Sequence, residues 1–138
     1  MRQRPPTVNC LDIGCLTNVI MAIVIDDDFA TVELLADLLA MNEIKVSGKG
    51  YSGKEAVELY KKVHPDVVFL DVMMRDYDGF YGLEKIREID PDAKVIMIMT
   101  DPRSDVEKKL KELKASAILY KPYDIDHLVK TVKHLLKI

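Results

Sequence analysis

The sequence has little of several features that mark particular classes of protein. It contains no tryptophan and only two cysteines, Cys10 and Cys15, which have no histidine nearby and lack the spacing of a zinc site or a redox pair. We interpret them as incidental thiols in a reducing cytosol. No apolar run approaches the roughly 18 residues of a transmembrane helix, and Asn9, Asp12 and Asn18 interrupt the first stretch that could act as a secretory signal. We therefore expect a cytoplasmic protein with no membrane insertion.

A large excess of one charge is also missing. The chain has 20 Lys and Arg against 23 Asp and Glu, a formal net charge of -3, so we expect no direct nucleic-acid binding through a general electrostatic attraction. Apolar residues make up 49% and charged residues 31% of the 138 residues, which is typical of a globular domain and not of a disordered chain. This length favours a single domain.

The chain divides into a short irregular start and a regular remainder. Residues 1–20 show no sustained period and contain Pro5 and Pro6, so we interpret them as an N-terminal appendage to a domain at 21–138. In the domain, short β-rich apolar runs alternate with segments of helical period, a pattern that predicts βαβ units and a parallel sheet. The predicted strands are 19–25, 44–48, 66–70, 94–99 and 116–120. The second alternates apolar and polar residues, which indicates a strand at the edge.

Helices are indicated between these strands and after the last one. Ser52 with Glu55, and Ser104 with Glu107, match the Ser-x-x-Glu capping box that begins a helix. Apolar residues at helical spacing mark one face of the first and of the last helix, namely Phe29, Val32, Ala36 and Leu39, and Ile125, Leu128, Val129, Val132 and Leu136. Right-handed crossovers then give an α/β fold with a doubly wound five-stranded parallel sheet, whose ligands bind at the carboxyl ends of the strands.

Polar residues follow the predicted buried strands at this carboxyl edge. They are Asp26, Asp27 and Asp28 after the first strand, Asp71 after the third, Thr100 and Asp101 after the fourth, and Lys121 after the fifth. Clustered carboxylates repel each other by about 4 kcal/mol for a pair roughly 4 Å apart at an effective dielectric constant near 20. A cation must offset this repulsion. Oxygen ligands without histidine or cysteine, in a site that can share a phosphate, favour Mg²⁺.

These residue types suit phosphoryl transfer. A carboxylate held by a metal ion and a lysine can attack phosphorus and form an aspartyl phosphate, while the cations offset charge on the phosphoryl oxygens. Asp71 is the predicted nucleophile and Lys121 the fixed positive charge, and Thr100 could donate its hydroxyl to a phosphoryl oxygen. An acid pair, an acid, a hydroxyl and a lysine at four strand ends therefore predict a phospho-acceptor site.

At these positions, residues 21–138 resemble the receiver domain of two-component response regulators of the chemotaxis type, which consist of a single domain. The resemblance implies a flavodoxin-like strand order 2-1-3-4-5 and a cis bond between Lys121 and Pro122. It also implies the site residues: Asp26 and Asp27 as metal ligands with Asp71 and the Met73 carbonyl, Asp71 in the segment LDVMMRDYDG as the phosphorylated residue, and Thr100 and Lys121 as its catalytic partners.

The resemblance further implies partners and a switch. The phosphoryl donor would be a sensor histidine kinase or a phosphotransfer protein, and the output would be contact with a downstream protein target. That contact, or a homodimer contact, would use the face formed by the helix after Ser104, the strand 116–120 and the last helix. Such a protein is a phosphorylated signalling protein and not an enzyme.

Three residues depart from the family pattern. Arg75 stands where the family usually has proline, and Asp101 replaces a small residue after Thr100. Ile118 occupies the position of the family's switch aromatic, three residues before Lys121. We expect the phosphorylation chemistry to remain, whereas the usual coupling between Thr100 and position 118 is expected to differ.

Two alternatives follow from the same residues. Asp26 and Asp28 form an Asp-x-Asp pair like that of haloacid-dehalogenase phosphatases, which also form an aspartyl phosphate with Mg²⁺. Ala30 replaces the Thr or Val usual there, and the chain has no room for a cap domain. The other alternative is a phosphorylation-independent interaction module on the same fold, with a relictual acidic pocket. The departures at Arg75, Asp101 and Ile118 favour it.

Overall fold

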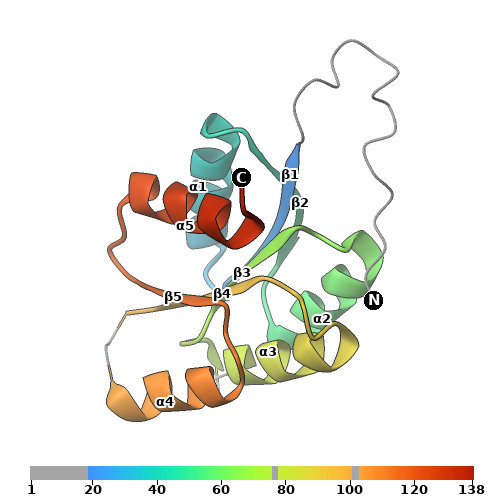
Figure 1. Cartoon of the computed structure of the whole chain (residues 1–138), viewed down its shortest axis with the longest axis vertical. Helices are drawn as coiled ribbons and strands as arrows, with labels where there is room; N and C mark the ends of the chain where they lie inside the picture. The colour runs from blue at the N-terminus through green and yellow to red at the C-terminus, as the bar shows by residue number, and fades with distance from the viewer. Residues whose placement is uncertain (1–18, 76–77, 101–102) are drawn as a thin grey trace.

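The computed structural model describes residues 19–75, 78–100 and 103–138 and forms a five-stranded parallel sheet with helices on both faces (Figure 1). The elements in chain order are β1 (Ile20–Ile25), α1 (Phe29–Met41), β2 (Ile44–Gly50), α2 (Gly53–Val63), β3 (Val67–Asp71), α3 (Asp78–Ile89), β4 (Val95–Met99), α4 (Ser104–Glu112), β5 (Ala117–Tyr120) and α5 (Ile125–Leu136). The strand order β2-β1-β3-β4-β5 confirms the predicted doubly wound α/β fold, with β2 at an edge.

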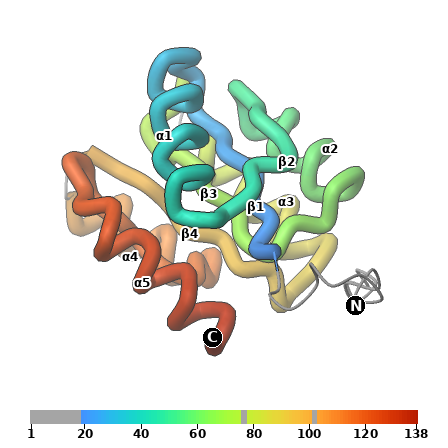
Figure 2. The backbone as a smooth tube through the Cα atoms, turned by 90° about the horizontal axis from the view of Figure 1, so that it is seen from above, coloured from blue at the N-terminus to red at the C-terminus, as the bar shows by residue number. Residues whose placement is uncertain are grey.

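Two hydrophobic clusters lie on the two faces of the sheet. The helices that cover these faces can be followed in Figure 1 and Figure 2. Because side chains alternate along a strand, β1 sends Ile23 and Ile25 to one cluster and Ala22 and Val24 to the other. α2, α3 and α4 cover the first cluster, and α1 and α5 cover the second. The central strand β3 is buried along its whole length, as expected for a parallel strand covered on both sides.

Two details of the predicted helices are wrong. Phe29 was expected on the buried face of α1, but its side chain is 65% exposed and stacks on Tyr51 with ring centroids 5.9 Å apart. α1 instead buries Leu35, so its apolar face begins one turn later. The capping box at Ser104 does not form, because Ser104 is the first helical residue and the N-cap Arg103 makes no side-chain capping hydrogen bond.

Both predicted helix starts are confirmed, since α2 begins at Gly53 and α4 at Ser104, but the capping box forms only at α2. The Ser52 hydroxyl accepts a hydrogen bond of 3.1 Å from the Glu55 amide, and the Glu55 carboxylate accepts one of 2.8 Å from the Tyr51 amide. The peptide bond between Lys121 and Pro122 is cis, as the family resemblance implied. Most of the predicted appendage at 1–20 lies outside the described residues. Among the helices that the structure describes, none has both the length and the apolar character needed to cross a membrane.

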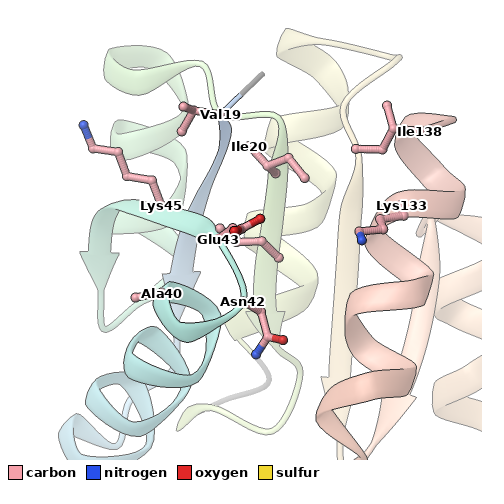
Figure 3. A pocket seen from close by; sticks show the side chains of 9 residues that line it. Val19, Ile20, Ala40, Asn42, Glu43, Lys45, Lys133 and Ile138 are labelled. Atoms are coloured by element: carbon pink, nitrogen blue, oxygen red, sulfur yellow. The ribbon is translucent and has the colours of Figure 1, made fainter. Parts of the chain in front are cut away.

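The amino end of the sheet holds buried polar groups that bond to each other. The Tyr60 hydroxyl donates a hydrogen bond of 2.7 Å to the Asp90 carboxylate, which is 3% exposed. The Arg87 guanidinium donates to the carbonyl oxygens of Ala93 at 2.6 Å and Lys114 at 2.7 Å, and so joins the turns before β4 and β5. An open pocket of about 630 Å³ also lies at this end, between the start of β1, the turn before β2 and the end of α5 (Figure 3).

Candidate functional site

Three carboxylates meet at the carboxyl end of the sheet. Asp26 follows β1, and Asp71 ends the neighbouring strand β3, where Ile25 pairs with Leu70. One oxygen from each of Asp26, Asp27 and Asp71 lies within 4.8 Å of the others. Asp26 and Asp71 are each only 5% exposed, whereas Asp27 is exposed. The two central strands therefore bring together the predicted metal ligands.

Lys121 supplies the positive charge in this cluster. Its ammonium nitrogen lies 3.2 Å from a carboxylate oxygen of Asp26 and 3.8 Å from one of Asp71. The Lys121 amide donates a hydrogen bond of 2.9 Å to the carbonyl of Met99 at the end of β4, which fixes the backbone from which the side chain reaches across. The predicted partnership of Lys121 with the acidic residues is thus present in the geometry.

Burial and repulsion act on the acceptor carboxyl. Burial and the neighbouring charge of Asp26 raise the pKa of Asp71 to about 6, although Lys121 and a 3.2 Å hydrogen bond from the Met73 amide act in the opposite direction. Burial would lower the pKa of the Lys121 ammonium, but the charges of Asp71 and Asp26 outweigh it and the pKa is raised. Near neutral pH Asp71 is therefore mostly ionised and Lys121 is protonated.

Asp28 has a structural role beside the cluster. Its carboxylate caps α1 by accepting a hydrogen bond of 3.2 Å from the Thr31 amide, and it also accepts from the Thr31 hydroxyl. The Asp28 amide donates a hydrogen bond of 3.0 Å to Asp26, which holds that carboxylate in place. The run of three aspartates therefore divides into two residues of the acidic cluster and one helix cap.

The remaining predicted residues surround this cluster. Thr100 directly follows β4, between the strands that end at Asp71 and lead to Lys121, and it is exposed. Ile118 is half-buried and packs against the hydrophobic cluster that α2, α3 and α4 cover. Arg75 is exposed and, with Asp27 and other residues, lines an opening of about 470 Å³. Asp101, the other departure from the family pattern, lies outside the described residues.

Sequence reasoning assigned no role to the start of α3, although it contacts the acceptor. The Asp78 carboxylate accepts a hydrogen bond from the amide of Gly53, the first residue of α2. Gly79 lies against the main chain of Asp71 and Val72. The available signal was the Asp-Gly dipeptide that closes the segment LDVMMRDYDG, but Asp-Gly also occurs in ordinary turns.

The donor set suits a hard divalent cation. The three carboxylates and the ammonium of Lys121 together leave two uncompensated negative charges in a site where two of the acids are buried. All available donors in this cluster are oxygens, which are the ligands that Mg²⁺ and Ca²⁺ prefer. The residues present therefore fit the predicted metal site on charge and on donor type.

Comparisons with known proteins identify the family of this chain. Residues 22–133 match the family model described as response regulator receiver domain. The chain is 27% identical over 115 residues to chemotaxis protein CheY of Thermotoga maritima, covering 83% of this chain and 96% of that protein. It is 31% identical over 117 residues to CheY of Treponema pallidum, covering 83% and 81%.

A solved structure gives the same result. The fold is similar to a chain in the crystal structure of the CheX-CheY-BeF3-Mg+2 complex from Borrelia burgdorferi, with a TM-score of 0.78, 28% identity, and coverage of 85% of this chain and 89% of that one. The family match, the strand order and the convergence of acids and lysine at one edge all lead to one assignment. The chain belongs to the response regulator receiver domain family.

Proposed function

We propose that this protein is a phospho-acceptor of a two-component system, which takes a phosphoryl group onto Asp71 with Mg²⁺ from a histidine kinase or phosphotransfer protein. One observation carries the proposal: Asp71 is 5% exposed, yet it lies beside two other carboxylates and 3.8 Å from the Lys121 ammonium. Such an arrangement is costly to bury unless it serves a charged ligand. We also propose that the protein acts in the cytoplasm and is not itself an enzyme.

The transfer reaction follows from the residues at the site. An oxygen of Asp71 attacks phosphorus and forms a new P–O bond, while the P–N bond to the donor histidine breaks and its electron pair goes to the imidazole nitrogen. Because the pKa of Asp71 is about 6, the attacking carboxylate is mostly ionised at pH 7. Lys121 and the hydroxyl of Thr100 would contact the phosphoryl oxygens.

Asp26 and Asp27, with Asp71 and the Met73 carbonyl, would hold the metal ion. Bound Mg²⁺ would offset negative charge on the phosphoryl oxygens during transfer. The complex from Borrelia burgdorferi, which contains BeF3 and Mg²⁺ with a CheY chain, supports this proposal for a relative 28% identical. The acidic cluster of this chain supports it from its own residues.

The test is phosphorylation by acetyl phosphate with Mg²⁺, followed by intact mass. We expect one added phosphoryl group in the unmodified protein and none in Asp71→Asn, because the amide keeps the shape of the side chain and lacks the nucleophile. Asp37→Asn, the same change at an exposed position of α1, is the matched control and should be labelled normally. Unchanged labelling of Asp71→Asn would contradict the proposal, and label on Asp26 would favour the phosphatase-type alternative.

The output is proposed to be a protein contact through α4, β5 and α5, with Thr100 and Ile118 as switch residues. Ile118 packs under α4, but an isoleucine has no hydroxyl and its β-branch restricts its rotamers, so it cannot move as an aromatic switch would. The ratio of partner affinity after phosphorylation to that before it should therefore differ between Ile118→Tyr and the unmodified protein. An unchanged ratio would remove position 118 from the output path.

A second candidate function is an interaction module that ignores phosphate. The aliphatic side chain at 118 is the observation that favours it. Acetyl phosphate again separates the two functions, since a module of this kind would bind its partner equally well with and without the added phosphoryl group. Capture of partners from a lysate with phosphorylated and unphosphorylated protein makes this comparison directly.

A further inference from the structure

The first turn of α3 packs against the main chain of the phospho-acceptor. A Cβ atom added at Gly79 would lie 2.8 Å from the Cα of Val72 and would overlap the carbonyl oxygen of Asp71. Both neighbours are backbone atoms, so neither can move aside as a flexible side chain would. The φ angle of Gly79 is not positive. Glycine is therefore needed here for space, because any side chain would push α3 and the acceptor apart.

The same turn of α3 is held from its other side by α2, which packs beside it (Figure 1 and Figure 2). The Asp78 carboxylate accepts a hydrogen bond from the amide of Gly53 at the start of α2. A Cβ atom at Gly53 would meet the side chain of Asp78 at 2.9 Å and would overlap its carbonyl oxygen. The start of α2, the start of α3 and the acceptor thus form three layers in direct contact.

We infer that Asp78 and Gly79 are positioning residues for the acceptor: through Asp78 the start of α2 holds α3, and through Gly79 α3 fixes the main chain of Asp71 and Val72. The inference rests on the proposed function of Asp71. Neither residue touches the phosphoryl group in this role. What they set is the turn after β3, in which the Met73 amide donates its 3.2 Å hydrogen bond to the Asp71 carboxylate.

This placement matters because phosphoryl transfer depends on alignment more than on binding. A displacement of about 1 Å can cost a reaction roughly a hundredfold in rate. Asp71 has little other freedom, since the amide of the next residue, Val72, is bonded to the carbonyl of Ile98 at 2.9 Å. A shift imposed at Gly79 is therefore transmitted to the carboxylate and to the Met73 hydrogen bond.

The first test compares Gly79→Ala with Gly82→Ala, the same change one turn later. At Gly82 the nearest atom to an added Cβ is the side-chain Cδ2 of Leu70 at 3.1 Å, which can move. We expect Gly79→Ala to lower the rate of labelling by acetyl phosphate about tenfold or more, to weaken Mg²⁺ binding in calorimetry, and to speed hydrogen exchange of the Met73 amide in metal-free protein. Gly82→Ala should change none of these. Equal behaviour of the two variants would overturn the inference.

A milder pair of variants covers the case in which Gly79→Ala does not fold. Asp78→Ala removes the acceptor for the Gly53 amide and should lower the labelling rate several-fold. Asp78→Asn keeps an oxygen that can accept this hydrogen bond but loses the charge, so it should restore most of the rate. If Asn is as slow as Ala, the charge of Asp78 matters and its hydrogen bond does not, and the inference is wrong.

These outcomes are separable from a failure of the proposed function. If the unmodified protein is not labelled at all, the proposal for Asp71 fails, and exchange of the Met73 amide still reports whether Gly79 positions the turn. If the unmodified protein is labelled and Gly79→Ala is labelled at the same rate, only the positioning role fails.

Discussion

The two ends of the sheet both bury charged side chains, but they satisfy them differently. At the amino end, the Arg87 guanidinium donates to backbone carbonyls, and Asp90 accepts from the Tyr60 hydroxyl at 2.7 Å and from the Asp92 amide at 3.0 Å. At the carboxyl end, Asp26 and Asp71 lie beside each other with one ammonium between them. At the amino end most of these polar groups are therefore bonded by the protein itself, although the buried Nε of Arg87 has no hydrogen-bond partner among the residues that the structure describes.

The carboxyl end keeps a surplus of negative charge that the ammonium group of Lys121 does not offset. This surplus destabilises the protein by itself, and under the proposed function a bound cation would offset it. This contrast predicts that substitutions at the amino end lower the free energy of unfolding, whereas loss of a carboxylate at the other end raises it in metal-free protein. Proteins often store unfavourable interactions at sites of function.

The largest effect is expected from Arg87→Ala at the amino end. This change removes the donor shared by the turns before β4 and β5 and leaves the carbonyls of Ala93 and Lys114 without it. Loss of these partly buried, charge-assisted hydrogen bonds should lower the free energy of unfolding by about 3–4 kcal/mol in urea titration. Arg87→Lys is the control, since it keeps the charge but not the planar fork, and it should recover only part of the loss. A loss below about 1 kcal/mol would mean that water replaces the guanidinium.

The opposite sign is expected from Asp71→Asn in metal-free protein. The folded pKa of Asp71 is about 6, above the roughly 3.9 of an unfolded aspartate. The folded state therefore binds more protons between these values, and the free energy of unfolding falls as pH rises from about 4 to about 6, by at most about 3 kcal/mol. In Asp71→Asn the free energy of unfolding should not show this decrease, so the variant should be more stable than the unmodified protein at pH 7. Parallel pH profiles for the two proteins would contradict the expected repulsion.

The sequence predicted the carboxyl end better than the amino end. Each acid and the lysine follow a strand, and parallel strands end at one edge, so Asp26, Asp71 and Lys121 could be placed together without coordinates. The Arg87 side chain bonds to the carbonyl of Lys114, 27 residues later in the sequence, and no local sequence pattern predicts this contact. The close contacts of Gly79 could not be predicted either, because the sequence does not show which part of the backbone lies opposite a glycine. The prediction that Phe29 is buried was wrong because helical period alone does not show where along a helix the contact with the sheet begins.

A smaller effect is expected from Asp27→Ala, which should abolish the gain in stability that Mg²⁺ gives. Asp27 is the exposed member of the acidic cluster, so its loss should leave the fold intact. At Mg²⁺ ten times its dissociation constant, the unmodified protein should gain about 1.4 kcal/mol of stability, and Asp27→Ala should gain none at the same concentration. Asp92→Ala, which removes an exposed carboxylate at the amino end, should keep the full gain. A gain that survives in Asp27→Ala would place the metal elsewhere.

The smallest effect is expected from Tyr60→Phe at the amino end. The phenyl ring keeps the packing of Tyr60, which is 1% exposed, and the change removes the 2.7 Å hydrogen bond to Asp90. Asp90 still accepts from the Asp92 amide, so the buried carboxylate keeps part of its support. We expect the free energy of unfolding to fall by about 1 kcal/mol. Tyr81→Phe makes the same chemical change at an exposed residue of α3 and should have almost no effect. If Tyr60→Phe were as neutral as Tyr81→Phe, the Tyr60 hydroxyl would not be needed to satisfy the buried Asp90, and the contrast between the two ends of the sheet would rest on Arg87 alone.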